Sequence, residues 1–184
     1  MELLALIEAC KQGKREAQKM FFMQYYGKVL KTCKRYSKDN DEAKDLAQES
    51  MIRIFEQMHT IKNADSLNGW VQKVAANNCL NELRKQKNIF SPLEDYHTDS
   101  ADINEEPTET YHPEQVLEYM QKLPVGYRTV LNLYAFENLT HKQIAQELNI
   151  SEGTSKSQLN KARLLLKKIL TKQPLNINQY GQEK

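Results

Sequence analysis

Strand-forming sequence is scarce in this chain of 184 residues. It contains six glycines, five prolines and few runs of β-branched residues, whereas strands are built mainly from β-branched and aromatic runs bounded by such turn residues. Its apolar residues recur instead at three- and four-residue steps, which is the spacing of amphipathic helices. The sequence therefore predicts an all-α fold.

Long apolar segments are also absent. No run approaches the ~18 apolar residues that a membrane-spanning helix requires. The first ten residues, MELLALIEAC, have no basic segment before the apolar part and no small-residue cleavage site, so they predict a helix and not a signal peptide. We expect a cytoplasmic protein without membrane insertion.

Cysteine and histidine are too few and too scattered to indicate a metal site or a catalytic centre. Three cysteines, an odd number, are widely separated at Cys10, Cys33 and Cys79, which is typical of small buried side chains in a reducing compartment. The four histidines show neither metal-ligand spacing nor a nucleophile–base pairing. We expect no metal, no cofactor and no enzymatic activity.

Negative charge is concentrated in one stretch of the chain. Residues 91–114 hold eight acidic residues and no lysine or arginine, whereas the whole chain has a net charge of +2. The remainder therefore carries +10. Two basic portions joined by an acidic connector are typical of a protein that binds a polyanion.

The acidic stretch also divides the chain into domains, because it is rich in Pro, Ser, Thr, Asp and Glu and poor in apolar residues. We predict two small helical domains joined by a flexible acidic linker. Their boundaries are residues 1–90, a linker at 91–112, a second domain at 113–172 and a tail at 173–184. Helices are predicted in the first domain at about residues 2–11, 15–37, 41–59 and 66–87.

The second domain contains the most specific local pattern, THKQIAQELNISEGTSKSQLNKARLLLKKIL at residues 140–170. Thr140 and Gln143 have the spacing of a capping box at the start of a helix. Asn149 tolerates the left-handed conformation of a tight turn, and Ser151 can cap a second helix. A short helix, a three-residue turn and a longer basic helix predict a helix-turn-helix that places its second helix in the major groove. The alternative is an ordinary helical hairpin with a solvated lysine face.

Two further helices carry polar faces. In the predicted helix at 66–87, three asparagines fall within five residues although asparagine is a poor helix former, so they are either hydrogen-bonding groups for a ligand or ordinary surface residues. The predicted helix at 41–59 has an acidic and amide-rich outer face, which is either a solvated surface or an interface for a partner helix. In the second domain, Tyr127, Val130, Leu131, Leu133 and Tyr134 are predicted core residues.

Taken together, three segments and their order resemble the extracytoplasmic-function sigma factors of bacterial RNA polymerase. The segments are DEAKDLAQESMIRIFEQM, GWVQKVAANNCLNELRKQK and, after the acidic linker, LPVGYRTVLNLYAFENLTHKQIAQELNISEGTSKSQLNKAR. The similarity covers residues 10–170. It implies an alternative sigma factor that binds core RNA polymerase and directs promoter-specific transcription initiation. A stand-alone helix-turn-helix regulator that binds duplex DNA is the alternative interpretation.

The resemblance implies roles for residues in the first domain. Asp45, Gln48 and Glu49 correspond to the face that docks on the clamp coiled coil of the polymerase largest subunit. Trp70 resembles the family tryptophan that anchors its own helix, the one predicted at 66–87, in the core. The residues implied in recognition and melting of the −10 element are Lys73, Asn77, Asn78 and Arg84, together with the loop at 60–68.

The resemblance implies that the second domain reads the −35 element as a duplex and contacts the polymerase flap. The contact positions on the recognition helix are Lys156, Ser157, Asn160 and Lys161. Many members have valine where this chain has Ser155, and we expect that serine to weaken the contact between the two helices. By family analogy an anti-sigma factor is a further partner.

Overall fold

The computed structural model describes residues 3–61, 63–85 and 113–172, and these belong to two compact units, Met1–Ile89 and Phe90–Lys184. Every regular element in the described residues is helical, which confirms the predicted all-α class. None of these helices is long and apolar enough to cross a membrane. The predicted linker at 91–112 and tail at 173–184 lie outside the described residues.

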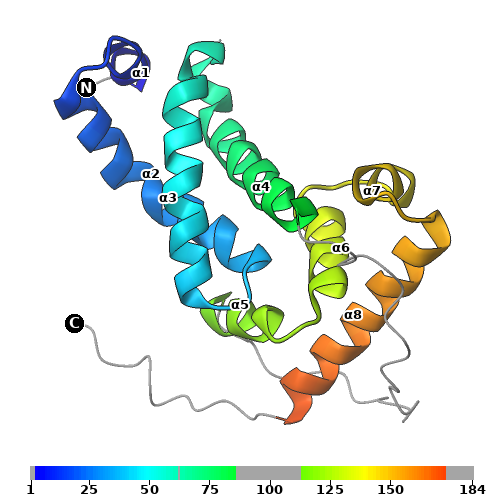
Figure 1. Ribbon diagram of the computed structural model, residues 1–184. Coiled ribbons are helices and arrows are strands. Elements are labelled where there is room, and N and C mark those ends of the chain that lie inside the picture. Colours follow the sequence, from blue (N-terminus) through cyan, green and yellow to red (C-terminus); the bar gives the residue numbers. More distant parts are fainter. Residues whose placement is uncertain (1–2, 62, 86–112, 173–184) are drawn as a thin grey trace. The chain divides into compact units, whose positions relative to one another are not determined.

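The first unit is a helical bundle (Figure 1). In it α2, α3 and α4 pack against one another, and α1 packs against α2. The element bounds are α1 Leu3–Lys11, α2 Arg15–Tyr36, α3 Asn40–Gln57 and α4 Leu67–Lys85. Gly13 separates α1 from α2 in the left-handed region, with φ 72°, which glycine enters without steric cost. Asp39 caps α3, because its side chain accepts a hydrogen bond from the Glu42 amide at 2.8 Å.

In the core of the first unit, a largely aromatic line of residues on α2 meets a line of small residues on α3. Phe21, Tyr25, Val29, Cys33 and Tyr36 are buried on α2, and Ala43, Ala47 and Ser50 are fully buried on α3. Small side chains let the two helix backbones approach closely, and the aromatic rings fill the space beside them. The cysteines Cys10, Cys33 and Cys79 are all free and buried, as the sequence predicted.

Two short 3-10 helices occupy the connection between α3 and α4, in and just before the loop predicted at 60–68. They are η1 Met58–Thr60 and η2 Ala64–Ser66. The Asn63 side chain caps η2 by accepting from the Asp65 amide at 2.9 Å, and Thr60 Oγ1 donates to the Gln57 carbonyl at 2.8 Å. Side-chain hydrogen bonds to nearby backbone groups thus fix the described turns on either side of residue 62.

The second unit consists of α5 Pro113–Gln121, α6 Val125–Ala135, α7 His141–Leu148 and α8 Glu152–Lys172. In it α8 packs against α5, α6 and α7. Arg128 of α6 is buried, and its Nη1 donates to the Gln121 carbonyl at 2.9 Å and to the Leu123 carbonyl at 3.4 Å. These carbonyls lie at the C-terminal end of α5, where a cation is favourable, so the arginine joins α5 to α6.

The helix-turn-helix prediction is confirmed in detail. Thr140 and Gln143 form a capping box at the start of α7. Asn149 ends α7 in the left-handed conformation, with φ 53°. Ser151 Oγ accepts a hydrogen bond from the Thr154 amide at 2.9 Å and caps α8. Local side-chain chemistry therefore determines both ends of the turn.

Candidate nucleic-acid and protein interfaces

A polar stripe on α4 contains most of the residues expected at the −10 element. Lys73, Asn77 and Arg84 are exposed, and their spacing places them on one side of the helix. Asn81 lies on the same stripe and accepts a hydrogen bond from Arg84 Nη1 at 3.1 Å. The stripe therefore offers amide groups between two cationic side chains, an arrangement suited to bases and phosphates.

Asn78 does not belong to this stripe, and its expected role as a DNA contact is corrected here. Its side chain is 1% exposed and its Nδ2 donates to Ser50 Oγ at 3.0 Å. A residue next to Asn77 points about 100° away from it around the helix, and that rotation carries Asn78 into the contact between α3 and α4. Asn78 is therefore a core hydrogen-bonding residue.

Trp70 also differs from its expected place. It is half-buried and not fully enclosed in the core, because the buried side of α4 at this point is formed by Leu67, Val71 and Val74. Trp70 precedes Lys73 and Asn77 at helical spacing, so its ring borders the polar stripe. Ile61, in the preceding loop, is buried and does not present its side chain to solvent.

The acidic face of α3 carries the residues expected to dock on the polymerase. Asp45 and Gln48 are exposed, and Glu49 is half-buried. Glu49 accepts a hydrogen bond from Arg53 Nη2 at 2.7 Å, and this hydrogen bond raises the pKa of Arg53 above its usual range. The Glu49 carboxylate is thus already engaged, so Asp45 and Gln48 are the more accessible polar groups of this face.

An exposed isoleucine on the same face was missed by sequence reasoning. The Ile52 side chain is 59% exposed, and its position follows Asp45 and Gln48 at helical spacing. A single exposed isoleucine is common on protein surfaces, but here it lies among polar groups expected to meet a helical partner. Apolar residues surrounded by polar ones are the usual centre of a protein interface. The residue could have been found by extending the stripe by one turn.

The recognition helix α8 presents its predicted contact residues outward. Lys156, Ser157 and Asn160 are exposed, and Lys161 is half-buried. Arg163 is also exposed and lies seven residues after Lys156 and three after Asn160, so it shares their side of the helix. Arg163 was missed by sequence reasoning, although the same helical spacing places it with these contacts.

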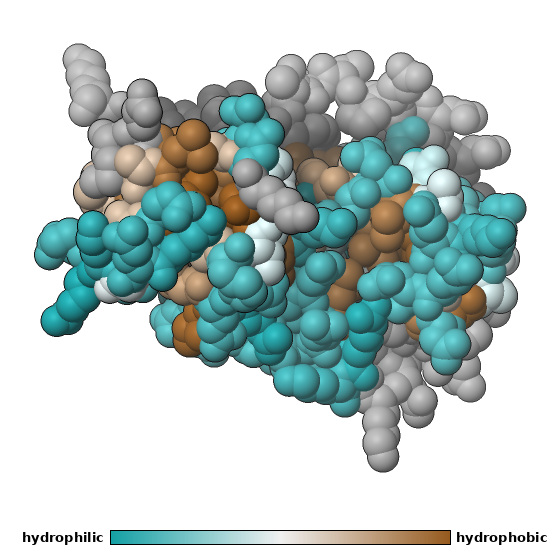
Figure 2. Space-filling view, turned by 90° about the horizontal axis from the view of Figure 1, so that it is seen from above, coloured by the Kyte–Doolittle hydropathy of each residue, from teal (hydrophilic) through white to brown (hydrophobic). Residues whose placement is uncertain are grey.

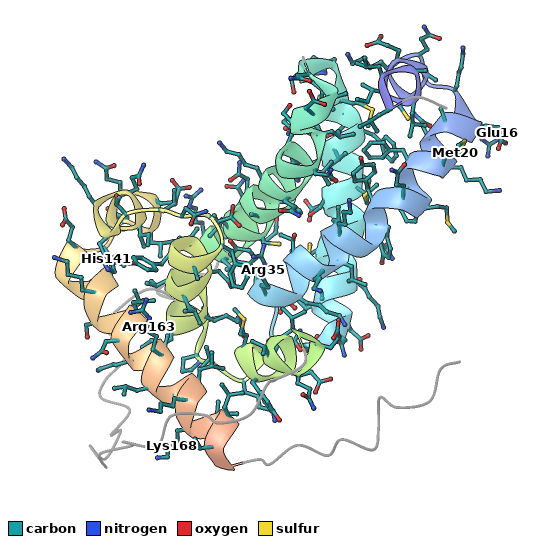
Figure 3. All side chains as sticks on the ribbon, turned by 180° about the vertical axis from the view of Figure 1, so that it is seen from behind. Glu16, Met20, Arg35, His141, Arg163 and Lys168 are labelled. Atoms are coloured by element: carbon teal, nitrogen blue, oxygen red, sulfur yellow. The ribbon has the colours of Figure 1, made fainter. Side chains whose placement is uncertain are left out.

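Behind this surface, Ser155 and Tyr134 differ from expectation. Ser155 does not simply weaken the contact between α7 and α8, because its buried hydroxyl is hydrogen-bonded to His141 Nδ1 at 2.9 Å. Tyr134 is 38% exposed and not a core residue. Its ring stacks on His141 with centroids 5.2 Å apart, and the Arg163 guanidinium lies 5.4 Å from the ring centroid. Figure 3 labels His141 on α7 and Arg163 on α8.

Hydrophilic residues cover most of the described surface that Figure 2 shows, with apolar side chains visible between them. Positive charge is concentrated in the helix-turn-helix, because residues 138–172 contain seven lysines and arginines and two glutamates, a net charge of +5. Such a segment attracts a polyanion such as duplex DNA. The acidic face of α3 in the other unit has the opposite character.

Comparison with known families places both units. Residues 21–89 match the model of Sigma-70 region 2, and residues 114–166 match the model of Sigma-70 region 4. The two matches occur in this order along the chain, one in each compact unit. They include α4, with its polar stripe, and the helix-turn-helix.

Several relatives are similar over most of their length. The ECF RNA polymerase sigma factor SigM of Bacillus subtilis is 31% identical over 149 residues, which cover 79% of this chain and 90% of the relative. The RNA polymerase sigma-H factor of Pseudomonas aeruginosa is 27% identical over 184 residues, covering 92% and 93%. A co-crystal structure of the sigma factor RpoE with the anti-sigma factor NepR from Bartonella quintana has a TM-score of 0.47 at 17% identity, covering 83% of this chain and 96% of that one. On the family models and the relatives, the chain belongs to the extracytoplasmic-function family of RNA polymerase sigma factors.

Proposed function

We propose that this sigma factor, which directs promoter-specific transcription initiation with core RNA polymerase, uses three separate surfaces. The α3 face binds the polymerase, the α4 stripe captures the opened −10 element, and α8 reads the −35 element. The observation that carries the proposal is the occurrence of a region 2 match and a region 4 match in the two compact units of one chain. A stand-alone regulator would need only the second of them.

At the −10 element, the proposed mechanism is capture of a single-stranded base. A protein cannot hydrogen-bond the Watson–Crick edge of a base that is still paired in a duplex, so the base must leave the stack. Asn77 supplies an exposed amide that both donates and accepts. Lys73 and Arg84 lie on either side of it along the stripe and neutralise phosphates of the opened strand.

Strand opening by this route requires no ATP hydrolysis. Unstacking a base costs a few kcal/mol, and binding of the extruded base and its phosphates by α4 offsets that cost. The chain then acts by binding alone and is not itself an enzyme.

At the −35 element, α8 would lie in the major groove of intact duplex. Lys156 can donate to the N7 and O6 acceptors of guanine, and Asn160 has the geometry for adenine. Ser157 and Lys161 lie beside them and contact backbone or base edges. Because lysine lacks the bidentate fork of arginine, we expect a softer sequence preference than an arginine at the same position would give.

The polymerase surface is proposed on α3. Asp45 and Gln48 provide exposed polar groups. Ile52, one turn after Gln48 on the same side of α3, provides an exposed apolar group. This pattern fits a basic helical partner such as the clamp coiled coil. We further propose that the second domain binds the polymerase flap and that an anti-sigma factor is another partner. The proposed location is the cytoplasm.

The experiment that tests the function is run-off transcription on genomic templates with purified core polymerase and the full chain. We expect defined transcripts that are absent with core polymerase alone and that require both units. The matched control is the chain with Asn77→Ala, which we expect to bind the polymerase normally and to form fewer open complexes. A footprint on duplex DNA by the chain alone, with no effect on core polymerase, would favour the stand-alone regulator.

A further inference from the structure

A continuous series of side-chain contacts joins the first turn of α8 to its third turn through two other helices. Ser155 on α8 is hydrogen-bonded to His141 on α7 at 2.9 Å. His141 stacks on Tyr134 of α6, with centroids 5.2 Å apart and planes inclined by 26°. The Arg163 guanidinium, again on α8, lies 5.4 Å from the centre of the Tyr134 ring. We call these three contacts the aromatic relay.

The buried end of the relay is fixed in position. Ser155 has no exposed surface, and its hydroxyl meets the imidazole at an ordinary hydrogen-bond distance. A hydrogen bond of this kind selects one ring orientation of His141, and the stacked ring then orients Tyr134. The orientation of the exposed tyrosine is thus determined from inside the helix-turn-helix.

The exposed end of the relay holds a guanidinium. An arginine over an aromatic ring is attracted by the negative face of the ring, and the five N–H donors of its guanidinium leave several free to bind a further group. The Arg163 guanidinium is therefore held beside Tyr134 while the residue stays exposed to solvent. A flexible side chain loses less conformational freedom on binding when it is already held.

The held guanidinium lies on the side of α8 that is proposed to face DNA. Arg163 is exposed at the i+7 position from Lys156 and the i+3 position from Asn160, so all three project from the same side of α8. Contacts further along a recognition helix meet the sugar–phosphate backbone at the edge of the groove. An in-plane fork of donors matches a phosphate.

We propose that Ser155, His141 and Tyr134 are positioning residues that hold Arg163 as a phosphate contact for the −35 duplex. The inference rests on the proposed function of α8, and it adds four residues to that site. The relay also explains why a serine stands at a buried position where an apolar residue would pack well, because its hydroxyl is the point at which the relay is anchored.

The test measures binding of holoenzyme, formed from core polymerase and the full chain, to a promoter recovered by run-off transcription. The salt dependence of the binding constant is recorded for each variant. Arg163→Ala should weaken binding and reduce the slope of log K against log salt by about one unit, since one phosphate contact is lost. Lys19→Ala is the control. It removes one positive charge from an exposed position on α2, outside the domain proposed to read the −35 element, and should leave the slope unchanged.

Double-variant cycles separate positioning from general structural damage. Tyr134→Leu and His141→Ala should each weaken binding by about two- to fivefold in the parent chain, the range expected for an exposed cation–π contact. In the Arg163→Ala background they should have no further effect. Tyr134→Phe, which keeps the ring, should bind like the parent. Thermal unfolding of each variant shows whether the fold is retained.

Each other outcome contradicts the inference. An unchanged salt slope for Arg163→Ala would remove it from the phosphate contacts. Equal losses in both backgrounds would make the relay a purely structural feature. If Lys156→Ala were also without effect on promoter binding, the proposed role of α8 would itself be wrong, and the inference would fail with it.

Discussion

Asn78 Nδ2 donates a hydrogen bond to Ser50 Oγ at 3.0 Å, across the contact between α4 and α3. Ser50 Oγ in turn donates to the Leu46 carbonyl at 2.6 Å. This buried polar pair holds the helix with the polar stripe against the helix with the acidic face. Its neighbour in sequence, Asn77, is turned away from this contact and exposed, and the two asparagines therefore have different roles.

Asn78→Ala should destabilise the chain. The substitution removes a buried hydrogen bond and leaves Ser50 with one partner fewer, which costs about 1–3 kcal/mol. The measurement is the free energy of unfolding by urea, followed by far-ultraviolet circular dichroism. Asn77→Ala is the matched control, and it should stay within about 0.5 kcal/mol of the parent because its side chain is exposed. Equal stability for the two variants would contradict the placement of Asn78.

Asn77→Ala should leave stability unchanged but impair promoter opening. It removes the proposed hydrogen bonds to the extruded base, so open-complex formation should fall by about tenfold or more, which corresponds to ~1.4 kcal/mol. Affinity for core polymerase should be unchanged. Permanganate reactivity of thymines near the −10 element measures opening, and a pull-down with core polymerase measures association. Parallel loss of both would count against base capture.

Ile52→Ala should weaken association with core polymerase without affecting stability. An exposed apolar side chain at the centre of an interface contributes more than 1 kcal/mol when buried by a partner, so we expect an affinity loss of about fivefold to tenfold. Met23, 75% exposed on α2, provides the matched control as Met23→Ala, which should bind as the parent does. Surface-immobilised core polymerase provides the readout.

Asp45→Lys tests the charge of the same face. Reversal at Asp45 should impair polymerase binding, and the effect should shrink as salt is raised. Asp45 is a better probe than Glu49, because reversal of Glu49 would also break its ion pair with Arg53. Wild-type binding by both Asp45→Lys and Ile52→Ala would move the docking surface away from this side of α3.

Lys156→Ala should weaken binding to the −35 duplex. If the contact is to phosphate, the salt slope falls by about one unit, and if it is to a guanine, the preference at that base pair relaxes instead. Binding of holoenzyme to promoters with single substitutions in the −35 element distinguishes the two. No change in either quantity would exclude Lys156 from the interface.

Sequence alone determined the helical class, the helix-turn-helix and its caps, because these depend on periodicity and on neighbours within three or four residues. Thr140, Asn149 and Ser151 act on their own turns, so no distant contact was needed to predict them. The family resemblance rested on the same local patterns. The polar character of α4 and the acidic outer face of α3 could also be predicted in this way.

Only the tertiary structure decided which of two adjacent residues faces inward. Neighbouring positions differ by about 100° around a helix. How α4 is turned about its axis is set by packing against residues far along the chain, and this decides that Asn78 faces inward and Asn77 faces solvent. In the same way, the packing of α2 buries Phe21 and Tyr25 and leaves Phe22 and Tyr26 at the edge of the core. The aromatic relay unites residues from three helices, and no spacing in the sequence reveals contacts that exist only once those helices are packed.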